Sequence, residues 1–287
     1  MKNRPVDIFE QIVQIRASGR RAALATIVRR VGSAPRKDAA RMLILDDGSS
    51  VGSVGGGCVE AQIWQEAHEV METGQPRFVS YELNEDDAEN EGLICGGRVD
   101  IFLEPIMSDP NLTILGAGHL GKATAELAVN VGFNVTVIDD RASFASAERF
   151  PDGTRVLVRE FAQGLSDLEL GSNSFILIVT RGHKHDLIAT ETAIQTPARY
   201  VGLVGSRRKI KLIVETLIEK GFTPQHFKNL FAPIGLEIGS ETPEEIAVSV
   251  VAELIAIRKG RHERSSKQEF IMKVLAGLGS EQKALKS

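Results

Sequence analysis

A glycine-rich segment in the middle of the chain constrains its fold more than any other feature. Residues 112–121 read Leu-Thr-Ile-Leu-Gly-Ala-Gly-His-Leu-Gly, a short apolar run followed by G-x-G-x-x-G. In a strand-turn-helix unit the first glycine makes the turn, the second lets a pyrophosphate approach the backbone, and the third lets helix and strand pack closely. The start of the following helix also favours phosphate. The pattern predicts a dinucleotide-binding turn at Gly116, Gly118, His119 and Gly121.

An acidic pair follows the next apolar run. Residues 134–138 are predicted to form the second strand, and Asp139, Asp140 and Arg141 come directly after it. An acid about 20 residues beyond the glycines accepts hydrogen bonds from a ribose hydroxyl in folds of this kind. Asp139 therefore favours an unphosphorylated ribose, whereas Arg141 leaves the phosphorylated form open.

Strands and helices alternate from residue 111 onward, which is typical of a parallel sheet with helices on its faces. The pattern predicts strands at 112–115, 134–138, 155–158, 175–179 and 200–204, and helices at 120–131, 143–149, 186–195 and 207–220. A short strand at 231–234 and a helix capped by Thr242 complete the series, because Pro243 and Glu245 form a capping box with that threonine.

Two further loops follow strands of this sheet and are therefore expected at the same carboxyl edge. In the loop 180–186, Thr180 and either Arg181 or His183 are expected to face a ligand; alternatively Asp186 only caps the next helix and the histidines are solvated. In the loop 205–209, Ser206, Arg207 and Arg208 form a candidate anion site at a helix start, with a solvated basic turn as the alternative.

The first part of the chain has a different pattern, which predicts a small α+β domain. Helices are expected at 5–17 and 58–73, strands at 21–31, 78–83 and 99–103, a hairpin at 41–54, and a linker at 104–111. We therefore predict three parts: an N-terminal domain at 1–108, a Rossmann-like doubly wound parallel-sheet domain at 109–259, and a C-terminal tail at 260–287 that is either a loosely attached helix or frayed.

Two loops of the first domain combine cysteine with glycine. Gly55, Gly56 and Gly57 precede Cys58 at a predicted helix start, and Cys95 precedes Gly96 and Gly97. Glycine runs allow a backbone to approach a ligand closely, and a helix N-terminus shifts a thiol toward the thiolate that coordinates soft metals. Two buried small residues are the structural alternative. Zinc is disfavoured because a four-ligand set with the usual spacing is missing.

Composition excludes several classes of protein. The 287 residues carry a net charge of -4, so nucleic-acid binding is not expected. No apolar run reaches the roughly 20 residues that span a bilayer, so no membrane span is expected. The first residues lack the apolar core of a signal peptide and the chain has two cysteines, which predicts a cytoplasmic protein with free thiols.

The chain resembles the XdhC/CoxI family, whose members are maturation factors for xanthine dehydrogenase and related molybdenum hydroxylases. The resemblance covers the chain to about residue 259. It is carried by residues 32–37, 40–42, 52–60 and 95–100 in the first part, and by residues 116–121, 139–141, 180–183, 202–209 and 233–239 in the second.

The resemblance implies a role for these sites. Members are thought to bind molybdenum cofactor, oversee its sulfuration with a cysteine desulfurase, and deliver it to the hydroxylase apoenzyme; we also expect a homodimer. Cys58, as the molybdenum-side ligand, and Cys95 would hold the metal end of the cofactor. Gly55 to Gly57 would admit the pterin, and Arg36, Arg207 or Arg208 would pair with phosphate. The Rossmann turn would hold either the nucleotide of a dinucleotide form of molybdopterin or a separate NAD(P).

Three classes of function follow from these features. A maturation chaperone accounts for both cysteine loops and is favoured over an enzyme. An NAD(P)-dependent oxidoreductase is the alternative, with His183 as proton donor or acceptor. A nucleotide-sensing regulatory module is the third. Bound pterin and molybdenum would distinguish the first class from the second.

Overall fold

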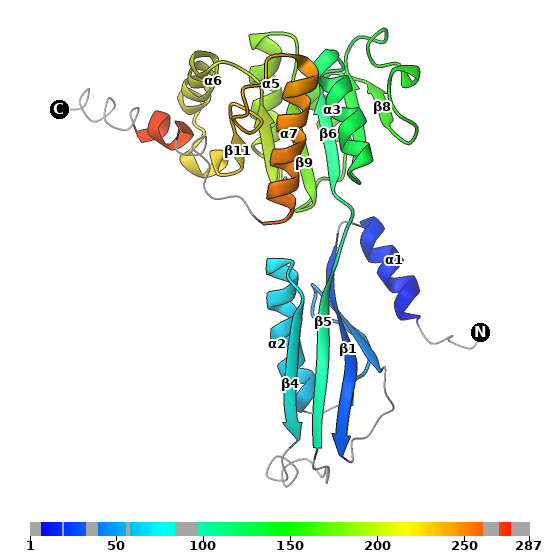
Figure 1. The fold of residues 1–287 in the computed structure, drawn as a ribbon. Helices are drawn as coiled ribbons and strands as arrows, with labels where there is room; N and C mark the ends of the chain where they lie inside the picture. Colours follow the sequence, from blue (N-terminus) through cyan, green and yellow to red (C-terminus); the bar gives the residue numbers. More distant parts are fainter. Residues whose placement is uncertain are drawn as a thin grey trace, which may run out of the picture. The chain divides into compact units, whose positions relative to one another are not determined.

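The structure is a computed structural model that describes residues 7–18, 20–32, 40–55, 58–83, 97–260 and 270–276. The chain divides into two compact units, Met1–Ser108 and Asp109–Ser287 (Figure 1). Each unit has its own apolar core. The units are therefore described separately.

The first unit is built on a five-stranded antiparallel sheet with the order β3-β2-β1-β5-β4. Its elements are α1 (Ile8–Ser18), β1 (Arg21–Gly32), β2 (Arg41–Leu45), β3 (Ser50–Gly52), α2 (Cys58–Thr73), β4 (Arg77–Leu83) and β5 (Gly97–Met107). Side chains alternate along β1, so Ala23 and Ala25 pack in the core under α2 while Ala22 and Leu24 pack with α1. The two helices thus cover opposite faces of the sheet.

The predicted linker 104–111 is shorter than expected, because β5 continues through Pro105 to Met107 and β6 begins at Asn111. Pairing between β4 and β5 ends at Leu103, whereas Pro105 still pairs with Ala23 of β1. Beyond Leu103 the described strands leave one side of β5 unpaired. A proline is tolerated there because its missing N–H faces the side without a ladder.

The second unit is a six-stranded parallel sheet with the order β11-β10-β9-β6-β7-β8. Its strands are β6 (Asn111–Leu115), β7 (Asn134–Asp139), β8 (Arg155–Val158), β9 (Ser174–Ile178), β10 (Tyr200–Leu203) and β11 (Leu230–Phe231). Its helices are α3 (His119–Asn130), α4 (Phe161–Ser166), α5 (His183–Ala193), α6 (Arg207–Glu219), α7 (Pro243–Arg258) and the short 3-10 turns η2 (Ala147–Arg149) and η3 (Pro224–Phe227). Counted from β6, this is the doubly wound order 3-2-1-4-5-6.

Helices cover both faces of this sheet, as predicted (Figure 1). The core on one face contains residues of α3 and α7, and the core on the other contains residues of α4, α5 and α6. The helices that follow β6 and β9 therefore leave the sheet toward opposite faces. That divergence defines a topological switch point between β6 and β9, where ligands bind in such sheets.

Two helices differ from the sequence prediction. The predicted helix 143–149 is a turn from Arg141 to Ala145 followed by η2, whereas the short helix α4 was not predicted. Of the predicted tail 260–287, the structure describes Gly260 and a helical segment at 270–276. Ile271, Val274 and Leu275 of that segment are buried in the core beside α6.

Candidate functional site: the glycine-rich turn of the second unit

Two glycines of the turn are required by the packing of the protein itself. Gly116 has φ +117°, and a Cβ on it would lie 2.4 Å from the carbonyl oxygen of Val179. A Cβ on Gly121 would lie 2.0 Å from the carbonyl oxygen of Gly116. Both distances are impossible for real atoms, so these glycines allow β6, α3 and the end of β9 to approach one another.

Gly118 differs from its neighbours because nothing in the described chain requires glycine there. It is the N-cap of α3 with φ −71° and ψ −171°, which other residues adopt readily. A Cβ on Gly118 would have no heavy atom within 4 Å. The open space lies beside the first amides of α3, where a helix attracts phosphate. The geometry therefore fits a pyrophosphate that approaches the backbone at Gly118.

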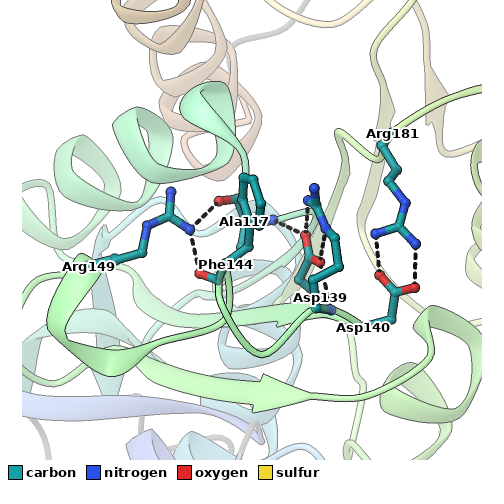
Figure 2. A network of polar contacts seen from close by, with 7 residues as sticks. Ala117, Asp139, Asp140, Phe144, Arg149 and Arg181 are labelled. Atoms are coloured by element: carbon teal, nitrogen blue, oxygen red, sulfur yellow. Dashed lines mark hydrogen bonds and ion pairs between the residues drawn. The ribbon is translucent and has the colours of Figure 1, made fainter.

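Asp139, at the end of β7, is bound by the protein on both of its oxygens (Figure 2). Oδ2 accepts hydrogen bonds from the Ala117 amide at 2.8 Å and from Arg141 Nη2 at 2.9 Å. Oδ1 accepts from the Arg141 amide at 3.0 Å and from its Nε at 2.8 Å. Burial raises the pKa of Asp139, but these hydrogen bonds outweigh it and lower the pKa to about 2.

The sequence predicted that Asp139 contacts a ribose. In the structure its side chain is 1% exposed and fixes the glycine-rich turn by accepting the hydrogen bond from the Ala117 amide. Arg149 reinforces the same turn, because its Nη1 donates to the carbonyl oxygens of Ala117 at 3.0 Å and Phe144 at 2.5 Å (Figure 2). Arg141 also lies 3.6 Å from the centre of the Phe144 ring. The loop after β7 is therefore tied to the turn by charged side chains.

Asp140 points to a different partner. Its two oxygens accept from Arg181 Nη1 at 2.9 Å and Nη2 at 2.6 Å, a bidentate pair visible in Figure 2. The Arg181 side chain is 40% exposed and that of Asp140 is 16% exposed. The structure thus connects the loop after β7 with the loop after β9.

The loop after β9 is held by a buried carboxylate that sequence reasoning assigned only as a helix cap. Thr180 Oγ1 donates to Asp186 Oδ1 at 2.7 Å, and Lys209 Nζ lies 2.5 Å from Asp186 Oδ2. Asp186 is fully buried, and α5 begins instead after Gly182. Asp186 therefore joins the starts of α5 and α6. His183 is exposed at the first position of α5.

The predicted anion site at the start of α6 is on the surface. Ser206 is the N-cap, and its hydroxyl accepts from the Lys209 amide at 3.3 Å. Arg207 and Arg208 are exposed. Arg207 lies 3.8 Å from Glu237 and 5.8 Å from the centre of the Phe270 ring. This helix start therefore carries a surface cation beside the segment 270–276.

Several predicted residues of the first unit lie outside the described residues, namely Arg36, Gly56, Gly57, Cys95 and Gly96. Cys58 is the first residue of α2, as predicted, and Gly97 is the first residue of β5. Glu60 anchors the segment before α2, because its Oε1 accepts from Ser53 Oγ at 2.7 Å and from the Val54 amide at 3.3 Å. The first turn of α2 is therefore hydrogen-bonded to the segment that follows β3, directly before Gly55.

A polar cluster next to Gly97 was missed by sequence reasoning. Asp100 Oδ1 accepts from Ser80 Oγ at 2.7 Å and from Arg98 Nε at 2.9 Å, and these bonds lower the pKa of Asp100. Arg98 and Asp100 are two residues apart on a strand and share a face, which is the signal that was available. The cluster fixes Arg98 at the end of β5 that follows the Cys95 loop in sequence.

Neither a metal cluster nor a membrane span is found among the described residues. No group of three or more His, Cys, Asp or Glu side chains there is arranged to hold a metal ion. No helix in that part of the chain is long and apolar enough to cross a membrane. The side chains of Cys58 and Cys95 are not among those described.

The strand order and the glycine-rich turn at the switch point define the second unit as a Rossmann domain, which confirms the predicted fold class. Residues 112–254 match the family described as XdhC Rossmann domain, and residues 15–82 match the XdhC and CoxI family. The chain belongs to the XdhC/CoxI family, as its sequence motifs predicted.

Three relatives from two bacteria align with most of the chain. It is 35% identical over 254 residues to the uncharacterized protein YqeB of Escherichia coli; the match covers 88% of this chain but only 46% of that protein. It is 26% identical to a probable xanthine dehydrogenase subunit of Bacillus subtilis, over 83% of this chain and 93% of that one. It is 24% identical to the molybdenum cofactor insertion chaperone PaoD of Escherichia coli, over 90% of each chain.

A solved structure shares the fold. The crystal structure of a protein described as a xanthine dehydrogenase from Bacillus halodurans aligns with a TM-score of 0.50 and 23% identity. The alignment covers 93% of this chain and all of that one. It supports the two-unit architecture and nothing about chemistry.

Proposed function

We propose that this chain is a maturation factor that binds molybdenum cofactor and supports its insertion into a xanthine dehydrogenase-like apoenzyme. The observation that carries the proposal is the alignment of both units with a molybdenum cofactor insertion chaperone over 90% of each chain. The name of one relative, the molybdenum cofactor insertion chaperone PaoD, favours a chaperone over an enzyme. In this role the cofactor is cargo, held and then released.

Each unit, taken by itself, has a feature whose chemistry suits a part of this cargo. The cofactor is a pterin with a dithiolene, which binds molybdenum, and a phosphate. The start of α2 at Cys58 would present a thiolate to the metal end, because a helix N-terminus lowers the pKa of a thiol. The open space at Gly118 fits the phosphate end, or the pyrophosphate of a dinucleotide form.

Three finer parts of the proposal follow the family resemblance. A cysteine desulfurase would supply sulfur while the cargo is bound, and Cys95 would act with Cys58. The Rossmann turn would accept either the nucleotide of the cargo or NAD(P). The chain would act as a homodimer, which sedimentation of the purified protein measures directly.

The cargo role is tested with Cys58 variants in a host that makes molybdenum cofactor. Cys58→Ala and Cys58→Ser should both reduce the molybdenum that stays with the protein through gel filtration by about tenfold, because neither side chain supplies a soft thiolate. Thr73→Ala is the control, since it removes only the hydroxyl at the other end of α2 that donates to the Glu69 carbonyl and accepts from the Gln75 amide. Equal molybdenum content in all four proteins would refute the assigned role of Cys58.

Loss of the whole chain tests the maturation role independently. In a host that makes a molybdenum hydroxylase, its deletion should leave the hydroxylase assembled but without active sulfurated cofactor. Full hydroxylase activity after deletion, together with NAD(P)-dependent turnover by the purified chain, would favour the oxidoreductase instead.

A further inference from the structure

The ion pair between Arg181 and Asp140 crosses the switch point of the Rossmann unit. Asp140 follows β7 and Arg181 follows β9, and the sheet order places β6 between these two strands. Because neighbouring strands are about 4.8 Å apart, β7 and β9 are separated by about 10 Å. A side-chain bond between their ends must therefore pass over the carboxyl end of β6, where the glycine-rich turn begins.

The exposure of the Arg181–Asp140 pair allows it to exchange partners, in contrast to the neighbouring Asp139. The Asp139 side chain is 1% exposed and accepts four hydrogen bonds. Separating this carboxylate from its donors would therefore leave a buried charge without a partner. Arg181 is 40% exposed and Asp140 is 16% exposed, so either can be solvated when the pair opens. Ion pairs with this much exposure contribute little to stability, and replacing one carboxylate by another anion has a small cost.

The anion that this position suits is a phosphate. Guanidinium groups bind phosphate oxygens in the same bidentate manner in which Arg181 binds Asp140. The space at Gly118, where a Cβ would meet no heavy atom of the described residues within 4 Å apart from its own chain neighbours, begins at the same end of β6. A pyrophosphate that enters this space meets the α3 amides on one side and the loop after β9 on the other.

We propose that Arg181 is a phosphate-binding residue of the Rossmann unit, which Asp140 holds over β6 until the pyrophosphate of a nucleotide takes its place. The inference rests on the proposed nucleotide site and adds to it the side chain that binds the phosphate. It also gives Asp140 a role other than the predicted direct contact with the nucleotide, because Asp140 competes with the ligand for Arg181.

Opposite effects of two variants test this exchange. The full chain is titrated by calorimetry with NAD⁺ and with cytidine diphosphate, which share a pyrophosphate and differ in the rest of the molecule. Arg181→Gln should weaken binding of either nucleotide by about tenfold, because a charge-assisted bond is lost. Asp140→Asn should strengthen binding by about twofold to fivefold, because the competing carboxylate loses its charge.

Lys220→Gln is the matched control. This substitution removes an equal charge from the same unit and breaks a side-chain pair with Glu191. Lys220 directly follows α6, and this end of the helix lies at the amino ends of the strands, away from the glycine-rich turn. Nucleotide binding should be unchanged in this variant. Unchanged affinity in Arg181→Gln, or weaker binding in Asp140→Asn, would overturn the exchange while the nucleotide site stands. If the wild-type chain binds neither nucleotide, the proposed nucleotide site itself fails, and the inference fails with it.

Discussion

At the scale of single residues, Asp139 and Asp140 show how one step along a strand end changes the role of a carboxylate. Asp139 is the last residue of β7, and its side chain points into the turn below α3, where the Ala117 amide needs an acceptor. Asp140 follows the strand, is partly exposed to solvent and pairs with Arg181. The Asp-Asp-Arg string does not distinguish these environments, because the direction of each side chain depends on where the strand ends.

The low pKa of Asp139 predicts that this residue contributes to stability above pH 4. Its pKa falls from 3.8 to about 2 on folding, so the folded state binds fewer protons between these values. Stability should therefore decrease as pH is lowered from about 5 to about 2, by about 2 kcal/mol from this residue alone. Asp139→Asn should lose about the same amount at neutral pH and show a flatter acid dependence.

Denaturant unfolding of both proteins at several pH values, followed by circular dichroism, measures this difference. Asp140→Asn serves as the comparison, because its partly exposed pair should change stability by less than about 1 kcal/mol. Parallel curves for the wild type and Asp139→Asn between neutral and acidic pH would contradict the prediction.

At the scale of elements, the periodic helices and buried strands could be predicted from the sequence, whereas two short segments could not. The helix α4 has six residues, contains Gly164 and has no side-chain cap, so local propensity gives no signal for it. Residues 143–149 looked helical, but Arg149 bonds to the carbonyl oxygens of Ala117 and Phe144 instead. In the second case a contact with Ala117, which is distant in sequence, outweighs local preference.

The candidate site shows the same division. The glycines and the start of α2 follow from local motifs, so they could be placed from the sequence. The ion pair between Lys209 and the buried Asp186 connects two helices. The hydrogen bonds from Ser80 to Asp100 and from Arg98 to Ser80 connect two strands. The spacing of Arg98 and Asp100 on one strand indicates that these two residues share a face. The approach of Ser80 to them, and of Lys209 to Asp186, depends on how separate elements pack, for which a single sequence carries no direct signal.

The segment 270–276 is predicted to be held by its apolar side chains. Ile271 is 2% exposed in the core beside α6, whereas Met272 is 60% exposed. Ile271→Ala should reduce the stability of the second unit by about 2 kcal/mol, because the lost side chain leaves a cavity. Met272→Ala is the neighbouring control and should change it by less than about 0.5 kcal/mol. Thermal unfolding of the two variants tests this, and equal midpoints would show that the segment does not pack as described.

At the scale of the whole molecule, each unit carries a proposed site that a single substitution is expected to remove. Gly118→Val should abolish nucleotide binding, because its side chain occupies the space meant for pyrophosphate. The same change should cost little stability, since φ is −71° and a Cβ meets no heavy atom within 4 Å. Gly121→Ala, by contrast, should destabilise the fold, because its Cβ would overlap the Gly116 carbonyl oxygen.

Comparing Gly118→Val with Cys58→Ala in the hydroxylase-producing host then tests whether maturation needs both sites. Gly118→Val should keep its fold, fail to bind NAD⁺ or cytidine diphosphate, and still reduce the yield of active hydroxylase, because the nucleotide or phosphate end of the cargo is no longer held. Cys58→Ala should bind the nucleotide normally and reduce the same yield through loss of molybdenum. Calorimetry on the purified variants and hydroxylase activity in extracts give the two measurements. Normal hydroxylase activity with Gly118→Val would restrict maturation to the first unit and leave the glycine-rich turn with a structural role alone.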